Sequence, residues 1–196
     1  MTPRLLAGIA GALGLLSATG ALAAPLYAND PEGMFGGGRP GGGLFGGSSP
    51  IPRTTVSYPS PHKPGTVVIN TAERRLYLVL GNGQALRYGI GVGRDGFTWS
   101  GVKTVTAKRE WPSWTPPEQM LRRRPDLPRF MPGGPDNPLG ARALYLGSTL
   151  YRIHGSNEPE TIGQAVSSGC FRLTNEDVVD LYERVQVGAT VVVQQH

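Results

Sequence analysis

The chain has 196 residues and a formal net charge of +5, with 19 lysines and arginines against 14 aspartates and glutamates. This modest positive charge favours an anionic polymer as a partner. The arginines lack the interleaved aromatic residues and the motifs of a nucleic-acid-binding module, so no nucleic acid is expected. One cysteine and three histidines make a structural zinc site difficult to build, and a single cysteine excludes an intramolecular disulfide.

Residues 1–24 show the three parts of a secretory signal peptide. Arg4 supplies a positive charge, a largely apolar stretch follows, and an Ala-x-Ala pattern ends at Ala23. The alternative is an uncleaved membrane anchor, because the apolar stretch approaches the ~20 residues that a bilayer requires. Its many small residues favour cleavage after Ala23 or Ala24, so the sequence predicts export to the periplasm.

Glycine, proline and serine dominate residues 25–64. Such a segment buries too little apolar surface to offset its ordering entropy, so we expect a flexible tether that proline stiffens locally. Residues 65–196 remain as one domain, which is long enough to form a hydrophobic core.

Short β-rich runs separated by turn signals follow within the domain. The Asn82-Gly83 pair is a strong hairpin signal, because this pair favours the tight turns that join antiparallel strands. We expect strands at residues 66–70, 75–80, 84–91, 102–108, 143–146, 150–153 and 190–193.

One helix is predicted after the cysteine. Thr174 begins a sequence that resembles a capping box with Asp177 in the fourth place, and apolar residues then recur on one helical face as far as Val185. Gly188 is expected to end this helix.

Residues 111–140 form a proline-rich insert that is too long for an ordinary connection, and long loops inside compact domains are usually lids or binding loops. The elements together predict a mainly β domain, a sandwich or distorted barrel of mixed sheets. One helix packs after the cysteine, and the long proline-rich loop lies over the site.

The single cysteine, Cys170, is a candidate nucleophile. It follows two serines and a glycine, a polar and bendable surrounding that is unlike a core strand, although a buried free cysteine is the alternative. His154 ends a predicted strand upstream and, apart from His196 at the chain end, is the only histidine in the domain. An imidazolium beside a thiol stabilises the thiolate, so the pair predicts a low-pKa nucleophile with His154 as its base.

The order of the two residues argues against other classes of cysteine enzyme. Papain-like and related peptidoglycan peptidases place the cysteine well before the histidine, and sortases place the histidine much further upstream than here. Residues 91–96 match Gly-x-Gly-x-x-Gly, but no helix pattern follows, so they are expected to form a turn and not a dinucleotide site. No cofactor and no metal is implied.

The residues around His154 and Cys170 resemble the L,D-transpeptidase catalytic domain family, also called YkuD or ErfK/YbiS-like. The family pattern is His-Gly near a strand end, a loop, and then Ser-His-Gly-Cys before an apolar residue and Arg or Asn. Here it reads His154-Gly155 and then residues 167–172, with Ser168 where many members have a second histidine. The likeness covers nearly the whole domain from residue 65.

The resemblance implies a peptidoglycan acyltransferase without a cofactor. Cys170 would attack the bond between diaminopimelate and the terminal D-Ala of a stem tetrapeptide, D-Ala would leave, and a thioester would remain. An amine would then resolve the thioester. It would come from the diaminopimelate of another stem peptide or from a protein lysine, for example that of an outer-membrane lipoprotein. In the family the base is the upstream histidine, here His154.

Other residues near the cysteine have candidate roles. The oxyanion formed in each half reaction needs donors about 3 Å away, and the backbone N–H groups of the nucleophile and of Gly169 are the nearest candidates. Ser167 and Ser168 are candidate substrate-binding residues. The carbonyl of Gly155, or a nearby side chain, is expected to fix the tautomer of the histidine.

Arg172 is the candidate for holding a substrate carboxylate, because its planar guanidinium matches one. The alternative is a structural ion pair with Glu158, Glu160 or Glu176.

Two rival functions stay open. An L,D-carboxypeptidase or hydrolase of the same fold would use water in place of the amine, and pocket shape and solvent exclusion would decide between them. A non-catalytic peptidoglycan-binding module would hold stem peptides in its groove without turnover, and the retained cysteine and histidine argue against it.

Overall fold

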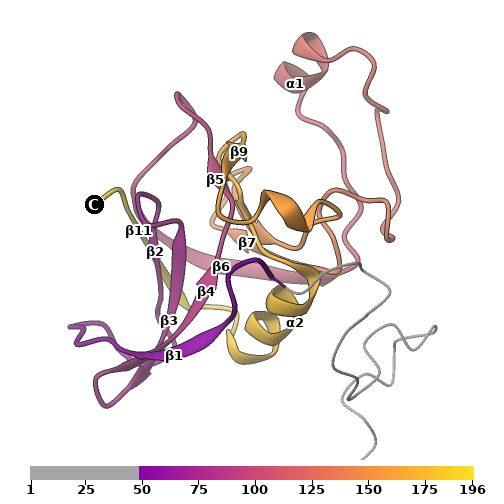
Figure 1. Ribbon diagram of the computed structural model, residues 1–196. Coiled ribbons are helices and arrows are strands. Elements are labelled where there is room, and N and C mark those ends of the chain that lie inside the picture. The colour runs from indigo at the N-terminus through magenta and orange to yellow at the C-terminus, as the bar shows by residue number, and fades with distance from the viewer. Residues whose placement is uncertain (1–48) are drawn as a thin grey trace, which may run out of the picture.

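The computed structural model describes residues 49–196, and the predicted signal peptide and residues 25–48 of the predicted tether lie outside the described residues. The described part is mainly β, as the sequence predicts (Figure 1). Within this part, no helix has the length and apolar character that crossing a membrane would require.

The elements follow in chain order. The strands are β1 (Thr54–Ser57), β2 (Val67–Asn70), β3 (Arg75–Gly81), β4 (Gln84–Gly89), β5 (Val92–Gly93), β6 (Gly101–Glu110), β7 (Arg142–Leu146), β8 (Arg152–His154), β9 (Ala165–Ser167), β10 (Phe171–Arg172) and β11 (Thr190–Gln194). The helices are α1 (Glu118–Arg123), α2 (Asn175–Arg184) and a short 3₁₀ helix (Pro159–Thr161).

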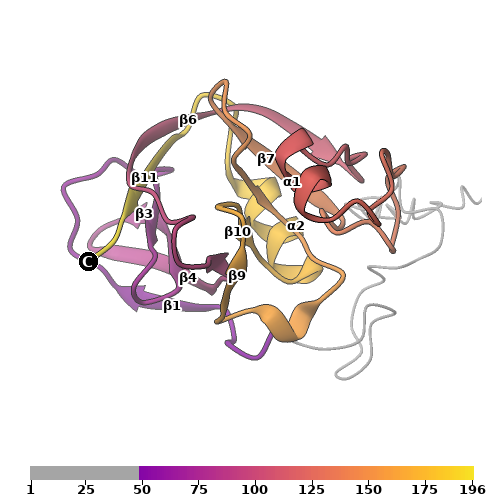
Figure 2. The same ribbon diagram turned by 90° about the horizontal axis from the view of Figure 1, so that it is seen from above.

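Nine strands form one mixed sheet in the order β1-β4-β3-β2-β11-β6-β7-β8-β10, and β5 pairs with β9 in a second, smaller sheet. The long strand β6 belongs to both halves of the large sheet, because its first residues pair with β11 and its last residues pair with β7. A register shift between Val105 and Ala107 marks the change of partner. Figure 2 shows β6 running from the group that contains β1, β3 and β4 to the group that contains β7 and β10.

A single hydrophobic core joins the two halves of the sheet. It contains buried side chains of β2 to β4, such as Ile69 and Tyr88, together with Leu144 of β7, Phe171 of β10 and Leu181 of α2. Because the two groups of strands share one core, the arrangement is the sandwich or distorted barrel of mixed sheets that the sequence predicts.

Helix α2 confirms the predicted cap and ends earlier than predicted. The Thr174 side chain accepts a hydrogen bond from the Asp177 N–H at 3.2 Å, as an N-cap does. The helix ends at Arg184, before Gly188, because the backbone is already extended at Val185. The Lys108 ammonium donates to the carbonyls of Tyr182 and Val185 and so binds acceptors that the helix end leaves open.

The described residues correct the end of the predicted tether. We call residues 49–57 the strap. Its strand β1 pairs antiparallel with β4, and Arg53 forms an ion pair with the buried Asp177 at 3.1 Å. Ile51 packs so closely on Gly89 that an added Cβ there would lie 2.5 Å from the Ile51 Cβ. The composition did not reveal this, because the strap has few apolar residues and takes its partners from distant parts of the chain.

The proline-rich insert rises beyond the sheets in Figure 1 and carries the short helix α1, which the sequence did not predict. Trp114 and Met131 exchange backbone hydrogen bonds of 2.8 Å and tie its two arms together. At its base the buried Asn137 donates to the Pro132 carbonyl and accepts from the Leu139 N–H. The insert is therefore a tied structure with defined contacts at both ends.

Candidate active site

Strands β8 and β10 place the predicted histidine and cysteine on one face. The strands run parallel, with Phe171 opposite Ile153 and Arg172 opposite His154. Phe171 and Ile153 are buried in the core, so the alternate residues project to the other face. His154 and Arg172 lie on that face, and Cys170 stands one step before β10 with the same orientation.

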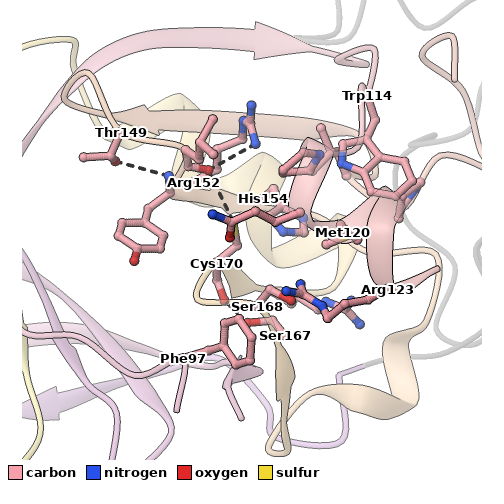
Figure 3. Close-up of a pocket in the computed structure, with 17 residues that line it drawn as sticks. Phe97, Trp114, Met120, Arg123, Thr149, Arg152, His154, Ser167, Ser168 and Cys170 are labelled. Atoms are coloured by element: carbon pink, nitrogen blue, oxygen red, sulfur yellow. Dashed lines mark hydrogen bonds between the residues drawn. The ribbon is translucent and has the colours of Figure 1, made fainter. Parts of the chain in front are cut away.

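Cys170 and His154 both line a pocket of about 450 Å³. The proline-rich insert supplies one wall, with Trp114, Met120 and Arg123 among its lining residues (Figure 3). The predicted position of the long loop over the site is thus confirmed.

The turn before Cys170 is held in place by hydrogen bonds and aromatic packing. The Ser167 hydroxyl donates to the Cys170 carbonyl at 2.6 Å and accepts from the Gly169 N–H at 3.2 Å. The Trp99 indole donates to the Gly169 carbonyl at 2.9 Å and stacks on Tyr151. Gly169 has φ +107°, and an added Cβ would lie 2.6 Å from the Tyr151 ring, so only glycine fits.

This turn bears on two of the roles expected from the sequence. The buried Ser167 hydroxyl donates to one group of the turn and accepts from another, so it positions the nucleophile, and the residue also lines the pocket. The Gly169 N–H is engaged by the same hydroxyl. Within residues 49–196, the Cys170 N–H has no protein acceptor, which leaves it as the unengaged backbone donor beside the sulfur. Ser168, the other candidate substrate-binding serine, also lines the pocket.

Burial of the two groups does not favour the imidazolium–thiolate pair that the sequence led us to expect. Burial, followed by the charge of Arg172, lowers the pKa of His154 to about 3, so the imidazole is neutral near pH 7. Burial also raises the pKa of the Cys170 thiol, although hydrogen bonding by Arg152 and the charges of Arg152 and Arg172 oppose the rise. The thiol points to the Leu150 carbonyl, 3.7 Å from Sγ, and in the described part of the chain it makes no hydrogen bond to His154.

The second ring nitrogen of His154 has the partner that the sequence offered as one option. Nδ1 lies 2.6 Å from the Gly155 carbonyl oxygen. A carbonyl only accepts hydrogen bonds, so a neutral ring that donates to Gly155 carries its proton on Nδ1 and leaves Nε2 unprotonated. The backbone of Leu139 is a second hydrogen-bond partner of the ring and, like that of Gly155, raises the pKa of His154 against the effect of burial. The ring is thus in the form that a general base requires.

Arg172 forms the structural ion pair that was the alternative to carboxylate binding. Its guanidinium lies 2.8 Å from Glu158, while the side chain also lines the pocket. Sequence reasoning missed Arg152, a second pocket arginine. Strand alternation could have found it, because Arg152 precedes His154 by two positions on the same strand and therefore shares its face.

The described residues contain no group of three or more His, Cys, Asp or Glu side chains that could hold a metal ion. The Gly-x-Gly-x-x-Gly run at residues 91–96 contains β5 and leads to strand β6 without a helix, so it lacks the structure of a dinucleotide-binding loop.

The fold and the pocket define a β-domain with a cysteine and a histidine on one face of two parallel strands, beneath a long insert. The chain belongs to the family described as YkuD, the L,D-transpeptidase catalytic domain, whose model matches residues 64–193.

Curated relatives include proteins named as probable L,D-transpeptidases. The chain is 42% identical over 134 residues to the probable L,D-transpeptidases ErfK/SrfK and YbiS of Escherichia coli K12. The match covers 64% of this chain and only 42% and 43% of those proteins, so the chain spans less than half of their length.

Among solved structures, one from Brucella melitensis described as a probable carnitine operon oxidoreductase is 46% identical, with a TM-score of 0.51. The match covers 76% of this chain and 98% of that one. L,D-transpeptidase 3 of Mycobacterium tuberculosis shares the fold, with a TM-score of 0.54, 18% identity, and coverage of 66% of this chain and 60% of that one.

Proposed function

We propose that this protein is an exported L,D-transpeptidase that acts on peptidoglycan stem tetrapeptides through a thioester on Cys170. The observation that carries the proposal is the position of Cys170 and His154 in one pocket, on one face of β8 and β10, in a chain of this family. Location in the periplasm follows from the predicted signal peptide and from the substrate.

Acylation begins from a neutral thiol and a neutral imidazole. As the donor enters, the thiol turns from the Leu150 carbonyl toward His154, and Nε2 takes its proton while sulfur attacks the carbonyl carbon between diaminopimelate and D-Ala. The C–N bond then breaks, the imidazolium gives the proton to the leaving amine, and D-Ala departs. The acyl group remains on Cys170 as a thioester.

The charge that develops on the carbonyl oxygen needs a donor near the sulfur. The Cys170 N–H is suited to this because it is unengaged and belongs to the turn held by Ser167 and Trp99. Gly169 becomes a second donor only if its N–H leaves the Ser167 hydroxyl. The guanidinium groups of Arg152 and Arg172 favour the thiolate that forms during the reaction.

Deacylation repeats the same proton transfers with an amine as nucleophile. His154 removes a proton from the acceptor amine, the amine attacks the thioester carbon, and the thiolate leaves and regains a proton. The acceptor is the diaminopimelate amine of another stem peptide or a protein lysine, such as that of an outer-membrane lipoprotein. Arg172 and Ser168 line the pocket and are candidate substrate contacts.

Incubation with purified disaccharide tetrapeptide tests the proposal. Mass spectrometry should detect released D-Ala, a thioester adduct on the wild-type protein, and a cross-linked product when an acceptor stem is added. The Cys170→Ser variant should release no D-Ala. Release by this variant at the wild-type rate would contradict the proposal, and free tripeptide as the only product would indicate a hydrolase.

A further inference from the structure

The pocket around Cys170 carries positive charge that its own lining does not balance. Arg123, Arg152 and Arg172 line it, and no aspartate or glutamate does. Arg172 is paired with Glu158, which lies outside the lining. Among residues 49–196, neither Arg123 nor Arg152 forms an ion pair. The pocket is therefore set up for an anionic ligand.

Arg152 is held beside the sulfur and keeps an unsatisfied donor. Its guanidinium lies 5.0 Å from the centre of the Tyr145 ring and donates to the Leu150 carbonyl at 3.2 Å. The same carbonyl faces the Cys170 sulfur at 3.7 Å. The Nε atom of Arg152 is buried and has no hydrogen-bond partner, an arrangement that costs free energy unless a ligand satisfies it.

We propose that Arg152 is a specificity-determining residue, which binds the free carboxylate of the donor's terminal residue and so selects acyl donors that end in a carboxylate next to the scissile bond. The inference rests on the proposed function, and it names one group of the donor and the residue that recognises it.

The connectivity of the donor supports this pairing. Only the amide nitrogen and one carbon separate the scissile carbonyl from the terminal carboxylate, so the carboxylate stays close to Cys170 when sulfur reaches the carbonyl carbon. The strand register places Arg152 directly opposite Cys170, one step before the pair of Ile153 and Phe171. A guanidinium at this position can offer a carboxylate a charge-assisted hydrogen bond.

Binding of a carboxylate at Arg152 would also strengthen the base. Burial and the charge of Arg172 lower the pKa of His154, and the charge of Arg152 adds to this effect. A bound carboxylate offsets the charge of Arg152, so the imidazole accepts a proton more readily when the correct donor is present.

A matched pair of donors tests the inference. One is disaccharide tetrapeptide ending in D-Ala, and the other is the same molecule ending in D-alaninamide. For the wild-type protein, kcat/KM for release of the terminal residue should be about 10- to 100-fold higher for the acid, as expected for a hydrogen bond between charged groups. In Arg152→Gln the ratio of acid to amide should fall to about one. In Arg152→Lys, which keeps the charge without the planar fork, it should stay in between.

Arg109→Gln is the matched control, because Arg109 is an exposed arginine of β6 outside the pocket and its loss changes the net charge equally. This variant should keep the wild-type ratio of acid to amide. A ratio that stays at the wild-type value in Arg152→Gln would overturn the inference, and so would a wild-type ratio near one. Partial misfolding would lower the two rates together and leave their ratio unchanged.

Equilibrium binding separates failure of the inference from failure of the proposed function. Cys170→Ala cannot form a thioester, and calorimetry should show tighter binding of the acid than of the amide by about 10- to 100-fold, with the difference lost in Cys170→Ala/Arg152→Gln. A wild-type protein that never releases D-Ala would disprove the proposed function, while this comparison would still decide the role of Arg152. Equal binding of acid and amide, or no binding of the acid, would overturn the inference.

Discussion

Cys170 and His154 rest as a neutral thiol and a neutral imidazole, because both are placed where burial disfavours charge. The nearby cations Arg152 and Arg172 act on the two groups in opposite directions. They disfavour an imidazolium and favour a thiolate, so they destabilise the protonated form of His154 and stabilise the deprotonated form of Cys170. General-base activation during the reaction is thus more consistent with the site than a preformed ion pair.

The pH dependence of alkylation should distinguish these two states. Iodoacetamide should modify Cys170 slowly at pH 6, and the rate should still rise above the ordinary thiol pKa of about 8.5. Because Cys170 is the only cysteine, the intact mass reports this site alone. His154→Gln should leave the midpoint in place. A midpoint near pH 6 that moves upward in His154→Gln would instead restore the imidazolium–thiolate pair.

Among the structural elements, the residue that follows β8 packs closely against the start of α2. Asn175, the first residue of α2, accepts a hydrogen bond from the Ala141 N–H at 2.8 Å and lies directly against Gly155. An added Cβ at Gly155 would be 2.3 Å from the Asn175 Oδ1 atom and 3.0 Å from the Ala141 nitrogen. Because the Gly155 carbonyl also holds His154, the position of the helix determines the position of the base.

Gly155→Ala should therefore disturb stability and catalysis together. Overpacking at such a site lowers the free energy of unfolding by about 1–3 kcal/mol, and displacement of the His154 ring should slow formation of the thioester. Urea unfolding and the rate of D-Ala release measure the two effects. Gly188→Ala is the control, because it has φ +95° but open space around the added methyl group. It should lower stability by about 1–2 kcal/mol and leave the rate unchanged.

The strap, residues 49–57, is a second structural element whose contacts lead to a prediction. Removal of residues 27–64 would be harmless if they formed only a tether, but the structure predicts a cost once the deletion reaches residue 49. A chain that starts at residue 49 should keep a higher melting temperature than one that starts at residue 65, by several degrees.

A point variant tests the same contact. Arg53→Ala should reproduce part of the loss, because Asp177 would remain buried without its partner. Arg75→Ala should change little, because the half-buried Arg75 forms no ion pair in the described part of the chain and its guanidinium donates to the carbonyls of its chain neighbours Glu73 and Arg74. Equal melting temperatures for the two truncated chains would show that the strap adds no stability.

Much of the fold was predictable where local signals and the fold agree. Asn82 and Gly83 both have positive φ, as their hairpin turn requires, and Thr174 caps α2 as its sequence indicates. The strands β1, β5, β9 and β10 were missed, because two to four residues show no reliable periodicity and their partners are distant in the chain.

The site was predictable as far as residue types allow. A lone cysteine and one suitable histidine pointed to the pocket, whereas the protonation states depend on burial and on Arg152, which only the folded chain brings to them.

At the scale of the whole molecule, two buried groups should oppose each other in the pH dependence of stability. The pKa of His154 is lowered to about 3, from about 6.5 when unfolded, so between these values the unfolded chain holds the extra proton and stability falls as pH falls. Mainly because of burial, the pKa of Asp177 is raised to about 6, from about 3.9 when unfolded. Between those values the folded chain holds the extra proton, so stability rises as pH falls.

Each group contributes a slope of up to about 1.4 kcal/mol per pH unit, and the two slopes largely cancel between about pH 4 and pH 6. Variants that remove one of the two groups should reveal the contribution of the other to the pH dependence of stability. Relative to wild type, Asp177→Asn should lose stability from pH 6 to pH 4, because the contribution of His154 is then unopposed. His154→Gln should gain stability over the same range, and the double variant should return to a slope close to that of wild type. Urea unfolding at pH 4, 5, 6 and 7 measures all four proteins on one scale. Parallel profiles for the four would mean that neither group changes its proton affinity on folding, and the neutral resting state assigned to His154 would then have to be abandoned.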